Sequence, residues 1–205
     1  MQPSFLFFDL GRVLVDFDTG RMFRQMAAVA GLEPERVREV VFGDGLQWQY
    51  ELGRLSTREF YEHFCQETGT RADFDALLEA GADIFELKPC VLPVVAQLRR
   101  AGYRLGVLSN TCAIHWEHCA GRYRIIAEAF EVETLSYRVG AAKPQREIFQ
   151  AAAEQAAVDP EEIFFVDDIP ENVDGARAAG FDAVRYTSTP ELVAELRKRG
   201  LRFNY

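Results

Sequence analysis

The sequence lacks any long apolar run. The apolar stretch Phe5–Phe8 is interrupted by Asp9 after four residues. A membrane-spanning helix needs about 20 apolar residues, and a signal peptide needs an apolar core of about 7 to 15. We therefore expect neither membrane insertion nor export, and we expect a cytoplasmic protein.

Cysteine is scarce, and positive charge is in deficit. The 205 residues include only four cysteines, which is far from the disulfide-dense pattern of small secreted domains and fits a reducing compartment. The formal net charge is −9, and such a surface repels phosphate backbones, so we expect no nucleic-acid partner. The remaining candidates for a partner are small molecules.

Low-complexity segments and internal repeats are also missing. With 48% hydrophobic and 27% charged residues, the composition is that of an ordinary globular protein. The length suits one domain, or one domain with a modest insertion. The sequence does not determine the oligomeric state and is compatible with a monomer.

Short apolar runs alternate with helical patterns over much of the chain. A run that is apolar on both faces, such as residues 4–9, is typical of a strand in a parallel sheet covered by helices. The alternation predicts βαβ units and an α/β fold, a Rossmann-like parallel sheet core flanked by helices. We expect strands at 4–9, 103–109, 163–167 and 182–186, a less regular one near 130–133, and helices at 90–101, 145–157 and 171–179.

The segment 16–88 has several helical patterns in succession and no convincing buried strand. Within it, Ser56 and Glu59 have the spacing of a capping box that opens a helix. We predict an inserted all-helical cap at 16–88, a core made of 1–15 and 89–205, and short hinges near Asp16 and Lys88. Most aromatic side chains of the insertion should form its core, but Trp48 or Tyr50 could face a ligand and stack on a sugar.

Polar side chains follow the predicted strands. They are Asp9, the run Ser109-Asn110-Thr111, the pair Lys143-Pro144 and the pair Asp167-Asp168. Ligands bind at the carboxyl ends of the strands in open parallel sheets. Carboxylates, a hydroxyl and an ammonium are the groups needed to hold a divalent cation and to attack a phosphoryl group. Alone, each has a plain structural explanation, such as a helix N-cap for Ser109 or a solvated lysine for Lys143.

The ordered set resembles the haloacid dehalogenase superfamily. The resemblance rests on Phe7-Phe8-Asp9-Leu10-Gly11, Val107-Leu108-Ser109-Asn110-Thr111, Lys143-Pro144, and Phe164-Phe165-Val166-Asp167-Asp168 with Asn172. More narrowly, Gly11 followed by Val15-Asp16-Phe17-Asp18, together with His115, is similar to bacterial phosphatases that act on glucose 1-phosphate. The N-terminal phosphatase domain of soluble epoxide hydrolases is a more distant likeness.

The resemblance implies a Mg²⁺-dependent phosphatase acting on small phosphomonoesters, with sugar phosphates as the expected class. Asp9 would be the catalytic nucleophile, would form an aspartyl-phosphate and would also bind the metal. The Gly11 backbone carbonyl and Asp168 would complete the protein ligands of Mg²⁺, and Asp167 would act on the cation through a water.

The remaining motif residues would bind the substrate. Ser109 and Asn110 would bind the phosphoryl oxygens, and His115 would contact the leaving group. Lys143 would be both catalytic and phosphate-binding, because its ammonium offsets the charge of Asp9 and the phosphate.

Gly11 departs from the superfamily pattern, which has an aspartate there as general acid and base. Such help is typically worth about 10²–10⁴-fold in rate. We prefer the explanation that a phosphate on an anomeric carbon has a good leaving group. Alternatively Asp16, Asp18 or His115 supplies the proton, or the phosphoenzyme persists and the protein transfers phosphate. Arg12 follows, and it could pair with Asp16 or Asp18 or reach the phosphate.

Three other interpretations remain. One is a haloacid dehalogenase acting on carbon, although the pair Asp167-Asp168 argues against metal-free chemistry. Another is a catalytically weak phospholigand-binding or regulatory protein. The third concerns only the set Cys112, His115, His118 and Cys119, which has zinc-ligand residue types but no known zinc spacing.

Overall fold

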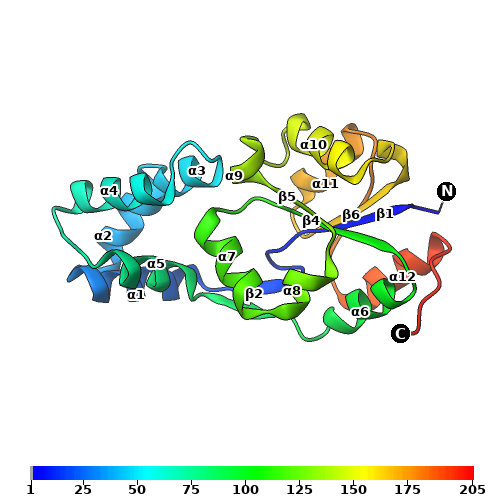
Figure 1. The fold of residues 1–205 in the computed structure, drawn as a ribbon, viewed down its shortest axis with the longest axis horizontal. Coiled ribbons are helices and arrows are strands. Elements are labelled where there is room, and N and C mark those ends of the chain that lie inside the picture. The colour runs from blue at the N-terminus through cyan, green and yellow to red at the C-terminus, as the bar shows by residue number, and fades with distance from the viewer. Residues whose placement is uncertain (1) are drawn as a thin grey trace.

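The computed structural model describes residues 2–205, and its centre is a parallel sheet of five strands (Figure 1). The strand order is β5-β4-β1-β6-β7, so the first strand of the chain lies in the middle. Every neighbouring pair in this sheet is parallel. The strands are β1 (Phe5–Phe8), β4 (Arg104–Ser109), β5 (Val132–Leu135), β6 (Ile163–Asp167) and β7 (Asp182–Arg185).

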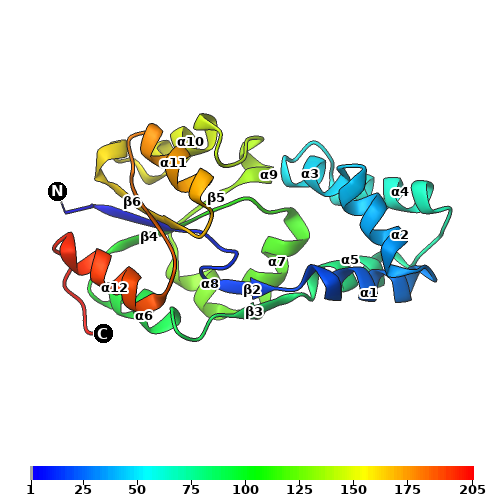
Figure 2. The ribbon, with the colours of Figure 1, turned by 180° about the vertical axis from the view of Figure 1, so that it is seen from behind.

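The central strand is fully buried because helices cover both faces of the sheet. Phe5 and Phe7 pack with the helices of one face, whereas Leu6 and Phe8 pack with those of the other. One face carries α9 (Ser136–Val139), α10 (Arg146–Ala156) and α11 (Pro170–Ala178), and the other carries α6 (Leu92–Arg100), α7 (Ala113–Arg122), α8 (Arg124–Ala129) and α12 (Thr189–Lys198) (Figures 1 and 2). A 3₁₀ turn, η2 (Pro160–Glu162), precedes β6.

The inserted segment forms the opposite end of the molecule from the two termini (Figure 1). A capping box at Ser56 and Glu59 opens α4, as predicted. The elements of the insertion are α1 (Thr19–Ala30), α2 (Pro34–Arg38), a π-helical turn η1 (Glu39–Gly43), α3 (Leu46–Glu51), α4 (Thr57–Thr68) and α5 (Phe74–Ala82).

Two short strands connect the insertion to the sheet. β2 (Val15–Phe17) pairs antiparallel with β3 (Phe85–Leu87), so the outgoing and returning chains form one ribbon. Between these strands the elements that the structure describes are all helical, as expected. However, β3 and most of β2 lie within the segment 16–88, for which the sequence predicts no buried strand. The ribbon lies where the sequence predicts hinges, while the domain boundaries at 15/16 and 88/89 stay a prediction.

The predicted α/β architecture is confirmed, and the boundaries of the sheet strands agree closely. The strand near 130–133 begins later than expected, at Val132, because Phe130 ends the preceding helix. None of the helices within residues 2–205 has both the length and the apolar character needed to cross a bilayer.

A close approach of β4 to β1 gives a stability prediction. A Cβ on Gly106 would lie 2.5 Å from Phe7 Cε1 and 2.8 Å from Phe5 Cε1. Gly106→Ala should therefore lower the free energy of unfolding by about 1–3 kcal/mol through overpacking. The matched control is Gly121→Ala on α7, where an added Cβ meets nothing within 4 Å, and it should raise stability by roughly 0.5–1 kcal/mol. Urea unfolding measures both, and equal effects of the two substitutions would contradict the prediction.

Candidate active site

The carboxyl ends of three adjacent strands bring the predicted residues together. Asp9 directly follows β1, Ser109 ends β4, and Asp167 ends β6. Because β1 lies between β4 and β6 in the sheet, these side chains meet at one edge, where parallel sheets bind ligands. Asp9 is held there by its own backbone N–H, which donates to the Val166 carbonyl oxygen at 2.9 Å.

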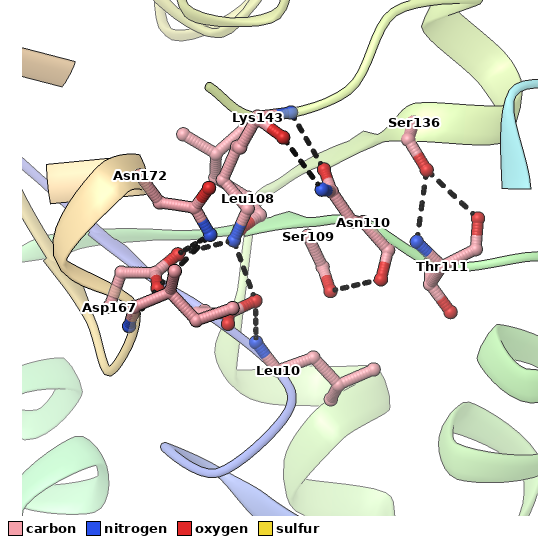
Figure 3. Close-up of polar contacts among 11 residues, drawn as sticks. Leu10, Leu108, Ser109, Asn110, Thr111, Ser136, Lys143, Asp167 and Asn172 are labelled. Atoms are coloured by element: carbon pink, nitrogen blue, oxygen red, sulfur yellow. Dashed lines mark hydrogen bonds and ion pairs between the residues drawn. The ribbon is translucent and has the colours of Figure 1, made fainter. Parts of the chain in front are cut away.

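Lys143 comes from the segment between α9 and α10, and its ammonium lies at the centre of this edge (Figure 3). The ammonium donates to the Leu108 carbonyl oxygen at 3.0 Å and to Asp167 Oδ2 at 2.6 Å. It also lies 2.9 Å from Asp9 Oδ1. An ammonium has three N–H donors, so these three oxygens satisfy it completely. Its side chain is 1% exposed.

Asp167 is buried and is committed to holding the site together. Its Oδ1 accepts the Ile169 N–H at 2.8 Å, and both its oxygens accept from the Asn172 amide, at 3.2 and 3.1 Å (Figure 3). With Lys143 on Oδ2, both oxygens have polar partners within the protein. Asp167 therefore positions the ammonium and the start of α11.

Asn110 bonds to the backbone of Lys143 rather than pointing into open space. Its amide donates to the Lys143 carbonyl oxygen at 3.0 Å and accepts the Lys143 N–H at 2.8 Å (Figure 3). The two bonds tie the end of β4 to the lysine. Both polar atoms of Asn110 are thus used to position Lys143, and its contact with a phosphate stays a prediction.

Burial and crowding of charge decide the protonation of the site. Burial raises the pKa of Asp9, and the charges of Asp167 and Asp168 add to this against the lowering effect of Lys143. Burial and Asp167 also raise the pKa of Asp168. Burial alone would lower the pKa of Lys143, but Asp9 and Asp167 outweigh it and raise that pKa. The Lys143 ammonium therefore stays protonated, and the carboxylates have too little positive charge around them.

The residues present fit a divalent cation. Asp9, Asp167 and Asp168 each offer a carboxylate oxygen, and these oxygens lie within 4.8 Å of one another. Three carboxylates facing the one ammonium of Lys143 leave negative charge uncompensated, and hard oxygen donors suit Mg²⁺. Leu10 N–H donates to Asp9 Oδ1 at 2.7 Å. Within the described residues, Asp9 Oδ2 accepts no hydrogen bond, which leaves it for a ligand.

Gly11 leaves room for an aromatic ring. A Cβ on Gly11 would lie 3.0 Å from Phe17 Cε1, so Phe17 occupies the space into which a side chain at position 11 would extend. An aspartate there would have to displace this ring. The absence of the usual acid is thus accompanied by packing that fills its place.

The other candidate proton donors are poorly suited to that role. Asp18 caps α1, and hydrogen bonding from the Arg21 backbone is the largest of the effects that lower its pKa, so it is ionised at neutral pH. His115 lies against the Gly81 carbonyl oxygen at 3.3 Å, and burial lowers its pKa to about 4. Asp16 lies 3.7 Å from Arg12 and 3.5 Å from Lys88. The pairing of Arg12 with Asp16 is one of the two predicted alternatives.

The zinc alternative gains no support, because the group of metal-ligating side chains found within residues 2–205 is the acidic one. Cys112 is buried and lies 3.7 Å from Gln47 Nε2. Tyr50 is 1% exposed and stacks on Phe60 at 4.9 Å, so its predicted role as a sugar platform is wrong. Trp48 is 45% exposed, and its contact with a ligand stays a prediction.

Sequence reasoning missed Ser136, which follows β5 at the same edge. Its hydroxyl donates to the Glu51 carbonyl oxygen at 2.6 Å and lies 3.0 Å from the Thr111 carbonyl oxygen, while Thr111 N–H donates to it at 2.9 Å. Ser136 therefore joins the insertion to the end of β4. A lone serine after a strand carries no signal of this role in the sequence.

Comparisons with known proteins agree with this geometry. Residues 6–180 match the family model of haloacid dehalogenase-like hydrolases. A phosphatase of Mycobacterium tuberculosis is 28% identical, over 89% of this chain and 87% of its own length. A D-ribitol-5-phosphate phosphatase of Bacteroides thetaiotaomicron is 26% identical, over 93% of both chains.

A solved structure is also similar. It is a haloacid dehalogenase family enzyme of Bacteroides thetaiotaomicron in complex with magnesium and inorganic phosphate. Its TM-score is 0.80 with 29% identity, covering 90% of this chain and 94% of the other.

The buried ammonium gives a prediction about stability. Lys143→Met removes the charge and leaves Asp9 and Asp167 buried without it, so the free energy of unfolding should fall by about 3–5 kcal/mol. Added Mg²⁺ should recover part of this loss, because a cation that binds the folded state stabilises it. Urea unfolding with and without Mg²⁺ measures both effects.

Lys198→Met is the control, because that side chain is 75% exposed and pairs with Glu195 at the surface. It should change stability by less than about 0.5 kcal/mol. Equal stabilities of the two variants would show that Lys143 does not hold the carboxylates.

Proposed function

The chain belongs to the haloacid dehalogenase-like hydrolase family, and we propose that it is a Mg²⁺-dependent phosphatase that hydrolyses small phosphomonoesters through Asp9. The observation that carries the proposal is the position of Asp9, a buried carboxylate 2.9 Å from the Lys143 ammonium and beside Asp167 and Asp168. The naming of the relatives as phosphatases supports it.

Asp9 would attack phosphorus and form an aspartyl-phosphate while the bond to the leaving oxygen breaks. Lys143 and the Leu10 N–H both hold Oδ1, which orients the carboxylate and leaves Oδ2 for the phosphoryl group or the cation. Water then attacks the phosphorus of the aspartyl-phosphate, releases phosphate and regenerates the Asp9 carboxylate.

Mg²⁺ bound by Asp9, Asp168 and the Gly11 carbonyl oxygen would withdraw charge from the phosphoryl oxygens. Asp167 would serve this centre indirectly, because its oxygens are already held by Lys143 and Asn172. Ser109, which is 3% exposed at the end of β4, would donate to a phosphoryl oxygen.

Sugar phosphates are the substrate class we propose. Phe17 fills the place of an acid at Gly11, so the leaving oxygen must depart with little protonation. A phosphate on an anomeric carbon meets this condition better than one on a simple alcohol. The relative named for D-ribitol 5-phosphate supports a small polyhydroxylated substrate.

The cytoplasm is the location we propose. The four cysteines are all free, which fits a reducing compartment.

The missing acid also favours the second candidate, a protein that binds phosphorylated ligands with little turnover. The two candidates differ in whether phosphate is released. Carbon dehalogenation is less well supported, because a cation-binding group of three carboxylates has no use in a metal-free displacement.

Phosphate release from a panel of sugar phosphates tests the proposal. The panel includes hexose 1-phosphates, hexose 6-phosphates and pentitol phosphates, each with Mg²⁺ and with a chelator. Wild type should release phosphate only with Mg²⁺, with 1-phosphates preferred. Asp9→Asn should lower kcat by about 10⁴-fold or more, since it removes the nucleophile.

Asp174→Asn is the matched control, because this carboxylate is 75% exposed and pairs with Arg177 on α11. It should leave turnover unchanged. Tight Mg²⁺-dependent binding of phosphate without release from any ester would instead support the binding protein. Full activity of Asp9→Asn would reject Asp9 as the nucleophile.

A further inference from the structure

Arg12 has a backbone conformation that its residue type disfavours. Its φ is +59°, and Ala157 is the other non-glycine residue with positive φ in the described chain. The left-handed region costs an ordinary L-residue roughly 1–2 kcal/mol. Residues held in such conformations cluster at active sites, and Arg12 comes directly after Gly11.

The surrounding loop holds Arg12 in this conformation. Its N–H donates to the Val15 carbonyl oxygen at 2.7 Å, and its own carbonyl oxygen accepts from Lys88 Nζ at 2.7 Å. Lys88 follows β3, so the two sides of the ribbon fix Arg12 together. The position of its side chain therefore depends on the ribbon that connects the insertion to the sheet.

The partners of the guanidinium group fix its orientation but do not occupy all of its N–H donors. It stacks on the Phe17 ring at 4.4 Å, and Nη2 donates to the Phe17 carbonyl oxygen at 3.1 Å. Nη1 lies 3.7 Å from Asp16 Oδ1, and the Arg12 side chain remains 49% exposed. A guanidinium has five N–H donors, so several remain for a ligand.

The location matters because Phe17 is also the ring that fills the space beside Gly11. The guanidinium thus lies on the ring that stands where the side chain of an acid at position 11 would extend. Arg12 is a cation at the edge of the site, on the side of the missing acid.

We propose that Arg12 stabilises the negative charge that develops on the leaving oxygen, in place of the proton that residue 11 would donate. The inference rests on the proposed phosphatase function. When the P–O bond breaks, its electron pair stays on the leaving oxygen, which the guanidinium binds as an anion. Arg12 keeps its proton, because a guanidinium is not deprotonated in proteins, and solvent water protonates the released oxygen.

This role specifies the substrate further. Electrostatic stabilisation without proton transfer is sufficient for a leaving oxygen of low pKa, such as that of an anomeric or aryl phosphate. It is insufficient for a simple alkyl phosphate. The ability of the enzyme to tolerate poor leaving groups should therefore depend on Arg12.

A series of aryl phosphates whose phenols differ in pKa tests the role, measured with Mg²⁺ for wild type and Arg12→Asn. Asparagine tolerates positive φ, so the loop should keep its conformation. Loss of one such stabilising group costs about 10²–10³-fold. We expect a loss of that size in kcat/KM for phenyl phosphate, a much smaller loss for p-nitrophenyl phosphate, and unchanged affinity for inorganic phosphate.

Two further variants separate this role from a structural one. Arg24→Asn removes another exposed arginine, which pairs with Asp18 on α1, and it should leave the whole series unchanged. Arg12→Lys keeps the charge but not the planar group, so it should recover part of the loss for phenyl phosphate.

The outcomes distinguish a failure of the proposed phosphatase function from a failure of the role proposed for Arg12. If wild type hydrolyses no ester in the series or in the sugar phosphate panel, the phosphatase function itself fails. If wild type is active but Arg12→Asn lowers kcat/KM equally for all leaving groups, the inference is overturned. An Asp16→Asn variant with the same losses as Arg12→Asn would also overturn it, because the ion pair or Asp16 itself would then explain the effect.

Discussion

The structure depends on one buried ammonium. Lys143 brings a positive charge to a place where the sheet ends in carboxylates, and its three acceptors come from β4, β6 and the residue after β1. An ammonium without partners is too costly to bury, so the strands and the lysine segment must reach their positions together. Asn110 fixes the lysine backbone, and Asn172 fixes Asp167. A Cβ on Gly175 of α11 would lie 2.8 Å from Pro144 Cβ, so only glycine leaves room for this proline.

The two cations of the site work under different conditions. Lys143 is a compact charge that is sealed in the protein and matched by two carboxylates, so it orients groups and balances charge. Arg12 is a planar group on an aromatic ring at the edge of the site, half exposed to solvent. A guanidinium is weakly hydrated and stacks on aromatic rings, which suits this position. Where the superfamily pattern has an acid at position 11, this chain has the packed ring of Phe17 and the fixed charge of Arg12.

The insertion is tied to the sheet by more than its connecting ribbon. Its apolar core is continuous with the one that covers the Leu6 and Phe8 face of the sheet. Polar bonds add to this, since Ser136 bonds to Glu51 of α3 and Tyr50 OH accepts the Ile114 N–H at the start of α7. His115 on α7 bonds to Gly81 of α5. These contacts lie next to the end of β4, so any movement of the insertion would reach Thr111 and the residues before it.

The sequence by itself determined the sheet strands, the helices that cover them and the edge at which Asp9, Ser109, Lys143 and Asp167 meet. Runs that are apolar on both faces are fully buried only in a parallel sheet that helices cover on both sides. In such a sheet the polar residues that follow the strands lie at the same edge. Only the tertiary structure decided the partners of Asn110, the burial of Tyr50 and His115, the bond of Ser136 to the insertion, and the place of Phe17 beside Gly11. Strands of three residues, such as β2 and β3, are too short to leave a periodic pattern. The partner of a polar side chain is set by residues distant in sequence, and no local pattern records that choice.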